Sequence, residues 1–195
     1  MNCSVFATLL ENAILTELEK FARLHSADRP YAFALIGGQC RSYLGYAIAS
    51  ETGLQRVAAE YDQIGYRYQG WSWENFDNCE KLAIWLRWST PDDGWQYGDF
   101  SEPVQKAFAQ LVGSRLLGEN ADELEPFCTA ALTSLTQEPK WHPWSSVTVG
   151  FSYGEDPRDF LRTATRANPH APVLKLWAES SRGEGLDRRI LPPKL

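Results

Sequence analysis

The stretch YAFALIGGQCRSYLGYAIA, residues 31–49, decides the fold. It holds two short apolar runs, residues 31–36 and 43–49, and the connection between them opens with Gly37 and Gly38. Two such runs with a glycine-containing connection predict a β-hairpin. Because the runs are apolar at nearly every position rather than at every second one, we expect the sheet to be covered on both faces.

Amphipathic helices are predicted on both sides of this hairpin. Residues 4–26 carry apolar side chains at steps of three and four, with Ser4 as the expected cap. A second helix begins at Thr52, which forms a capping box with Gln55, and ends near Gly65. Later helices are predicted over residues 101–117, 123–135 and 157–167, the last of which opens with Asp156 and Pro157.

Further strands are predicted in the second half of the chain. Residues 81–89 alternate in a way that favours a strand, with a helix over residues 73–86 as the alternative. Residues 147–153 alternate apolar with small polar side chains, which predicts a half-buried strand, and residues 173–177 form a candidate last strand. The order of elements predicts an α+β fold, with a mainly antiparallel sheet of about four or five strands and about five flanking helices.

The length of 195 residues fits one domain. We predict a single domain over residues 1–178, followed by a flexible tail over residues 179–195. That tail contains Pro192 and Pro193 and the main basic cluster of the chain, which is diluted by acidic residues. The cluster consists of Arg182, Arg188, Arg189 and Lys194.

Composition argues against several classes of protein. The net charge of −6 leaves no basic stripe for a nucleic acid, and no window is apolar enough for a membrane span. The first ten residues lack the basic start of a secretory signal, so a cytoplasmic location is expected. The four cysteines are far apart and form no CxxC pair, which predicts neither a metal site nor a disulfide framework.

No motif for catalysis or cofactor binding is found. The glycines match no phosphate-binding pattern, and a GxSxG elbow is absent. His25, His142 and His170 show no metal-binding spacing. We therefore predict no catalytic residue, cofactor or metal, although a Cys–His pair stays open because such partners need not be close in sequence.

Residues 66–100 form an aromatic and acidic block. They hold ten of the 25 aromatic residues, with six carboxylates against three cations. Aromatic side chains bury much area with few rotatable bonds, and with an acidic rim they are typical of a recognition surface. Arg87 is expected to lie on a tryptophan face or to pair with a carboxylate, as a structural clasp, with a role in contacting a ligand as the alternative. The predicted partner-binding residues are Trp71, Trp73, Glu74, Asp77, Asp92, Asp93, Trp95 and Tyr97.

The same block allows an enzymatic alternative. Glycoside hydrolysis uses two carboxylates beside rings that stack on sugars. Candidate carboxylates are Glu74, Asp92, Asp93 and Asp99, and candidate rings are Trp73 and Trp95. A third interpretation is an adaptor domain without catalysis.

Several short pieces resemble one bacterial family, the domain of unknown function 4303. They are residues 31–35, the second hairpin run, the helix at Thr52, and Arg87-Trp88-Ser89 with Trp95. The resemblance covers roughly residues 5–177. Members of such families are often regarded as immunity proteins encoded beside polymorphic bacterial toxins. The resemblance therefore implies a cytosolic protein that binds a cognate toxin domain and occludes its active site. The toxin, the contacting surface and the oligomeric state stay open.

Overall fold

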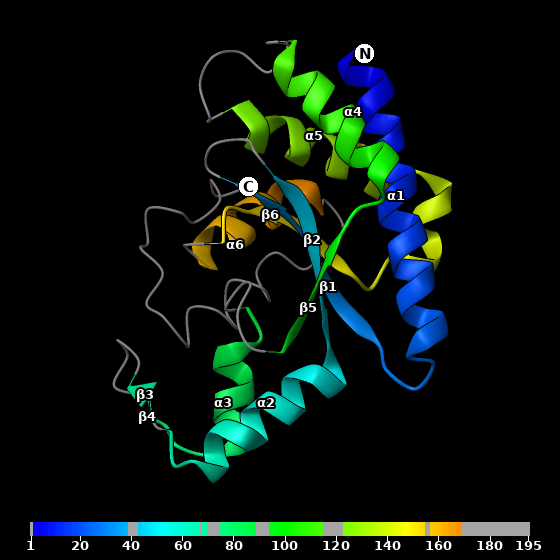
Figure 1. Cartoon of the computed structure of the whole chain (residues 1–195). Helices are drawn as coiled ribbons and strands as arrows, with labels where there is room; N and C mark the ends of the chain where they lie inside the picture. The colour runs from blue at the N-terminus through cyan, green and yellow to red at the C-terminus, as the bar shows by residue number, and fades with distance from the viewer. Residues whose placement is uncertain are drawn as a thin grey trace, which may run out of the picture.

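The computed structural model describes residues 2–38, 43–66, 68–69, 75–88, 94–114, 123–154 and 157–168. Its centre is a four-stranded sheet with the order β5-β2-β1-β6 (Figure 1). β2 pairs antiparallel with β1 and with β5, whereas β6 pairs parallel with β1. The strands are β1 (Pro30–Gly37), β2 (Leu44–Ser50), β5 (Trp95–Asp99) and β6 (Thr148–Ser152). The predicted hairpin is confirmed as β1 and β2, and the α+β class agrees, but the sheet is mixed.

Helices cover both faces of this sheet (Figure 1). One layer contains α1 (Cys3–Leu24), α4 (Glu102–Gly113) and α5 (Leu124–Gln137). The other contains α2 (Glu51–Gln63), α3 (Cys79–Leu86) and α6 (Pro157–Ala167). A 3-10 helix, η2 (Pro139–Trp144), follows α5, and a two-stranded ribbon of β3 (Tyr68–Gln69) and β4 (Asn75–Phe76) precedes α3.

The two faces of the hairpin carry side chains of different size. Phe33, Leu35 and Ile48 face the α1 layer and are buried there. Ala34 and Ala47 face the α2 layer and are equally buried. Every residue of β1 and β2 except Pro30 is buried, which confirms that the sheet is covered on both faces. The small side chains let α2, α3 and α6 approach the sheet closely.

Two helices begin at residues other than those predicted. Asn2 caps α1, because its Oδ1 accepts a hydrogen bond from the Val5 amide at 2.9 Å, so the prediction of Ser4 was wrong. Ser50 caps α2 through the Gly53 amide at 3.2 Å, in place of the predicted capping box at Thr52. In both cases a polar residue two positions earlier supplies the cap.

The strand predicted over residues 81–89 is wrong, since α3 occupies most of that segment. Asn78 caps this helix by accepting the Lys81 amide at 3.0 Å. Leu82 and Leu86 are one helical turn apart and are buried, whereas Ile84 is 40% exposed. A strand would have placed all three on one face. The helix proposed as the alternative is therefore the better description, although it begins at Cys79.

The strand predicted over residues 147–153 exists as β6 but is not half-buried. All five of its residues are buried, including Thr148 and Ser152. α6 covers one face, and Gly150 lies so close to it that an added Cβ would be 2.7 Å from the Phe160 ring. The predicted strand over 173–177 and the predicted tail over 179–195 lie outside the described residues. None of the helices in the described part is long and apolar enough to cross a bilayer.

Candidate protein-binding surface

Five of the eight predicted partner-binding residues lie outside the described part of the chain, and the other three come from β5 and from the segment before α3. The five are Trp71, Trp73, Glu74, Asp92 and Asp93. Asp77 lies two residues before α3, where it forms an ion pair with Lys81 at 2.8 Å. Trp95 and Tyr97 both belong to β5.

Trp95 is a core residue. Its side chain is 7% exposed, and its ring meets those of Tyr31 and Phe160 at centroid distances of 6.3 and 5.5 Å. Its indole nitrogen has no hydrogen-bond partner among the described residues. A ring in this position is not available to a partner or to a stacking sugar, so we remove Trp95 from the predicted surface.

Tyr97 lies two residues further along the same face of β5 and is 56% exposed. It stands opposite Ala47 of β2, and Asp99 stands opposite Gly45. The Tyr43 ring covers Gly45, since a Cβ there would collide with it. Burial and a hydrogen bond to the Asp99 carboxylate raise the pKa of Tyr43 to about 12. Tyr43, Gly45, Tyr97 and Asp99 are called the β5 surface below.

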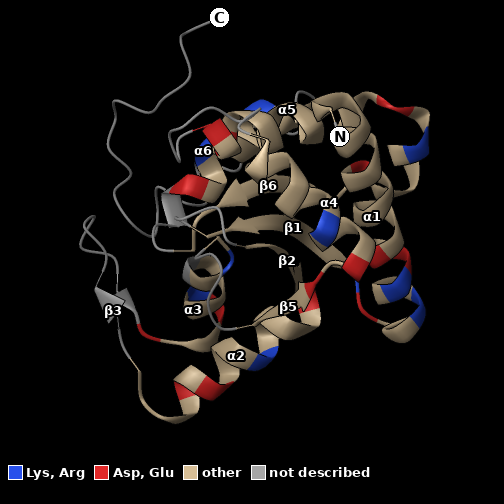
Figure 2. Cartoon of the chain, turned by 45° about the horizontal axis from the view of Figure 1, so that its top comes forward, with Lys and Arg blue, Asp and Glu red and all other residues tan. Residues whose placement is uncertain are grey.

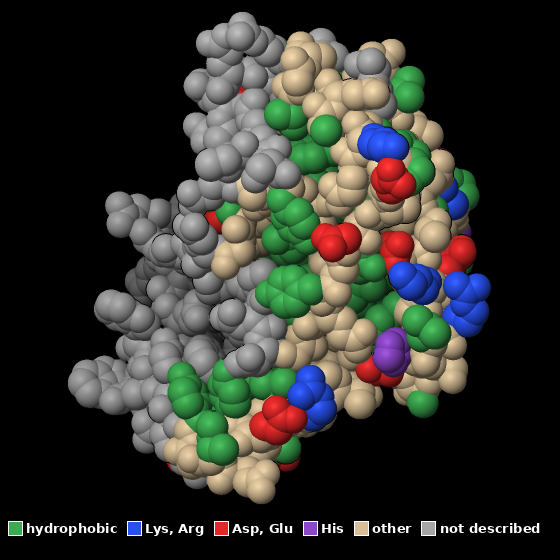
Figure 3. All heavy atoms as spheres, viewed as in Figure 1, with side chains coloured by type: hydrophobic (Ala, Val, Ile, Leu, Met, Phe, Trp, Pro, Cys, Tyr) green, Lys and Arg blue, Asp and Glu red, His purple; other side chains and the backbone are tan. Residues whose placement is uncertain are grey.

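Hydrophobic and acidic side chains occur together on this side of the molecule. Figure 3 shows green and red side chains over the area where Figure 1 places β5. Figure 2 shows acidic residues at the junction of β5 with α4 and on α1. The β5 surface thus combines two exposed tyrosines with negative charge, and of the predicted partner-binding residues it contains Tyr97.

A cavity of about 170 Å³ lies between α1 and the β5 edge of the sheet, and Tyr97 is one of the residues that line it. Tyr46 donates a hydrogen bond to Glu17 at 2.6 Å, and Lys20 pairs with the same carboxylate at 3.2 Å. Burial, followed by the bond to Glu17, raises the pKa of Tyr46 above its ordinary value. The residues that line the cavity are Glu17, Lys20, Phe21, Leu24, His25, Tyr46, Ile48, Gln96 and Tyr97.

The sequence did not identify the α1 side of this site. Glu17 and Tyr46 are 29 residues apart, and neither belongs to a local motif. The sequence places Tyr43 only in an apolar run. Its position at the edge of that run is the signal that could have identified it, because a side chain just before a buried strand can lie at the surface.

Arg87 forms the structural clasp that its sequence context predicted. Its two terminal nitrogens donate to both carboxylate oxygens of Glu51 at 2.7 and 2.8 Å. The guanidinium carbon lies 4.7 Å from the ring centroid of Tyr31, so the ring partner is a tyrosine and not a tryptophan. Tyr31 donates back to the Arg87 carbonyl at 2.9 Å. These contacts fasten the end of α3 to the start of α2.

Catalytic and metal chemistry find little support in the described residues. No group of three or more His, Cys, Asp or Glu side chains there is arranged to hold a metal ion. Cys128 is completely buried, and burial raises the pKa of its thiol, so this cysteine is a poor nucleophile. For glycoside hydrolysis, Trp95 is buried and Asp99 is hydrogen-bonded to Tyr43. The other candidate carboxylates and Trp73 lie outside the described ranges.

Searches for similar proteins place the chain in a family. No curated protein and no solved structure matches it. A family model described as a domain of unknown function, DUF4303, matches residues 10–138. The match includes α1 from its eighth residue onward, α2 and α3, the strands β1, β2 and β5, and both helices that follow β5. Because this match spans more than half of the sequence, the chain belongs to the DUF4303 family.

Proposed function

We propose that this chain is an immunity-type protein of bacterial competition. It would bind a cognate toxin domain in the cytoplasm and neutralise it by covering the toxin's active site. The observation that carries the proposal is the exposed Tyr97, which stands on β5 beside the Tyr43–Asp99 pair. Tyrosine is enriched in the centres of protein interfaces because it offers a large rigid ring and a polar tip.

Charge supports a basic partner. The net charge is −6, and Asp99 is exposed on the β5 surface. Negative charge attracts the basic cleft of an enzyme that acts on an anionic substrate, and it raises the association rate more than the final affinity. Asp92 and Asp93 belong to the same proposal on sequence grounds alone.

Co-expression tests the proposal directly. This chain would be expressed with the C-terminal domain encoded by the adjacent upstream gene, and growth and co-purification would be scored together. We expect that domain to kill cells by itself, and we expect this chain to restore growth and to elute with it. A harmless neighbour, or rescue without a complex, would show that occlusion is not the mechanism.

The surface itself is tested by replacing Tyr97 with alanine. In the complex we expect the dissociation constant to rise at least about tenfold, which is the size of a moderate interface contact. Ile64→Ala is the matched control, since Ile64 is 76% exposed but follows α2 and lies outside the β5 surface. If both variants bind as tightly as the parent, the toxin contacts another surface.

Long-range charge is tested by the association rate. Asp92→Lys together with Asp93→Lys should lower the rate constant for association and its dependence on salt. Stopped-flow mixing at two salt concentrations measures both quantities. Unchanged rates in a complex that still forms would argue against electrostatic steering.

A further inference from the structure

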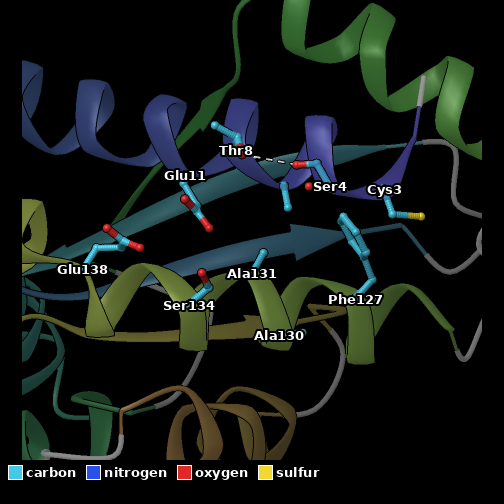
Figure 4. A pocket seen from close by; sticks show the side chains of 10 residues that line it. Cys3, Ser4, Thr8, Glu11, Phe127, Ala130, Ala131, Ser134 and Glu138 are labelled. Atoms are coloured by element: carbon cyan, nitrogen blue, oxygen red, sulfur yellow. Dashed lines mark hydrogen bonds between the residues drawn. The ribbon is translucent and has the colours of Figure 1, made fainter.

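A second cavity, separate from the β5 surface, lies between the first half of α1 and α5 (Figure 4). Its volume is about 410 Å³. Small side chains form its floor, Phe127 and Cys3 close one end, and two carboxylates stand at the other (Figure 4). The floor residues are Ser4, Ala7, Ala130, Ala131 and Ser134.

The carboxylate end carries a net negative charge, because two carboxylates stand there with one paired ammonium. Glu11 is only 8% exposed, and its Oε2 pairs with Lys140 at 3.1 Å. The other oxygen of Glu11 accepts no hydrogen bond from any described residue. Glu138 is exposed and forms no ion pair within the described part of the chain. Both carboxylates point into the cavity in Figure 4. This end of the cavity therefore holds two carboxylates, and the Lys140 ammonium pairs with Glu11.

The position of this end on α5 adds to the negative potential. α5 ends at Gln137, and Glu138 occupies its C-cap. The C-terminal end of a helix carries a partial negative charge from its unpaired carbonyl groups, which favours a nearby cation. This end of the cavity therefore favours a positively charged group, because Glu11, Glu138 and the C-terminal end of α5 meet there.

We propose that this groove binds an arginine side chain carried by a short apolar segment of a partner protein. The guanidinium would lie between Glu11 and Glu138, where its planar set of donors can reach both carboxylates. The segment would lie along the small side chains towards Phe127. From Phe127 to Glu138 the groove follows about 16 Å of α5, at 1.5 Å per residue. That length suits a piece of polypeptide better than a compact metabolite.

The charge requirement is tested with a small probe. The isotope-labelled full chain would be titrated with n-butylguanidinium chloride and followed by amide chemical shifts. n-Butylurea, which has a similar shape but no charge, is the reference probe. We expect saturable shifts at Ser134 and Glu138 with the cation and none with the urea. Equal shifts with both probes, or none with either, would overturn the proposal.

Two variants assign the site. Glu138→Gln should weaken binding of the guanidinium at least about fivefold, the loss expected for one partly exposed charged contact. Glu123→Gln is the matched control, since Glu123 is an exposed carboxylate at the opposite end of α5. Ala130→Leu fills the groove from an exposed position and should block binding without unfolding the helix. Equal weakening by the two glutamine variants would show nonspecific attraction and overturn the proposal.

A peptide probe distinguishes a site for a protein segment from a site for a small guanidine. Acetyl-Leu-Ala-Arg-Ala-Leu-amide offers the same cation together with apolar contacts for the floor. We expect it to bind at least about tenfold more tightly than n-butylguanidinium, because it buries additional apolar area. If the peptide binds no more tightly, the groove is a site for a small guanidine and not for a partner protein.

Discussion

At the scale of single residues, two aromatic side chains of β5 that were predicted to bind a partner differ in exposure. Trp95 and Tyr97 lie on the same face of β5, yet Trp95 is 7% exposed and Tyr97 is 56% exposed. Trp95 meets Phe160 of α6, whereas Tyr97 lies beyond the buried cluster on that face. Alternation along a strand tells which residues share a face, but where the covering helices end is a tertiary property.

The raised pKa values of three tyrosines predict that the folded state loses stability at alkaline pH. Burial raises the pKa of Tyr31, Tyr43 and Tyr46, in the case of Tyr43 to about 12 from an ordinary value of 10.0. A group with a raised pKa in the folded state stabilises that state fully below its unfolded pKa. The stabilisation is lost as the pH rises towards the folded pKa. The free energy of unfolding should therefore fall from about pH 10 upwards.

Urea unfolding between pH 8 and 12 measures this loss, with phenolate absorbance recorded in parallel. Asp99→Asn should shift the pKa of Tyr43 back towards its ordinary value, because it removes the negative charge that stands beside the Tyr43 hydroxyl. A free energy of unfolding that stays constant up to pH 12 would contradict the prediction.

At the scale of elements, α6 closes one edge of the sheet with side chains. The backbone groups of Val149 and Phe151 point away from β1, and they bond to side chains of α6 and of Asn168, the residue that follows it. The Asn168 amide bonds to the nitrogen and the oxygen of Val149 at 3.0 and 2.6 Å. The Thr163 hydroxyl does the same for Phe151 at 2.7 and 2.8 Å. A strand edge closed in this way cannot pair with another chain.

Replacing Asn168 with alanine should destabilise the fold by about 2–4 kcal/mol, because it leaves buried backbone groups of Val149 without partners. Urea unfolding measures this change in the free energy of unfolding. We expect the slope of that free energy against urea concentration to stay unchanged. Thr165→Ala is the control, since among the described residues that hydroxyl bonds only to the Arg162 carbonyl of its own helix, and its loss should cost less than about 0.5 kcal/mol. If the two variants lose the same free energy of unfolding, the side-chain bonds to the β6 edge do not stabilise the fold.

The sequence predicted elements well where local signals agree. The hairpin followed from Gly37 and Gly38 between two apolar runs, and α6 from a proline at its first position. α3 was missed because Leu82, Ile84 and Leu86 fit a strand as well as a helix, and only burial separates them. The parallel pairing of β6 joins segments more than 100 residues apart. No local pattern contains that information.

The candidate site was less accessible to prediction. Tyr97 was named from an aromatic block, and the structure places it at the surface. Tyr43 and Glu17 were not named, because they come from a strand and a helix far away in the chain. The α1–α5 groove is lined by alanines and serines that any surface helix contains. Only the packing of the two helices brings Glu11 and Glu138 to one cavity.

At the scale of the whole molecule, the family match ends before the fold is complete. It stops at residue 138, whereas β6 and α6 follow. Phe151 of β6 is wholly buried in the core beside α1, and Phe160 of α6 is wholly buried in the core beside α2. Each of the two cores thus depends on a phenylalanine from the last elements. An ion pair of Arg162 with the buried Glu125, at 2.6 and 2.9 Å, ties α6 to α5.

A chain cut after residue 138 should therefore fail to fold. Loss of two buried phenylalanines alone costs about 3–5 kcal/mol each, which is comparable with the whole stability of a typical domain. The cut also leaves the edge of β1 open. Circular dichroism and urea unfolding of the fragment should show no cooperative transition. A chain that ends at Asn168 is the matched control, because it keeps every described residue of both cores. If the 1–138 fragment unfolds cooperatively at the same urea concentration as that control, β6 and α6 are an addition to a domain that is already stable.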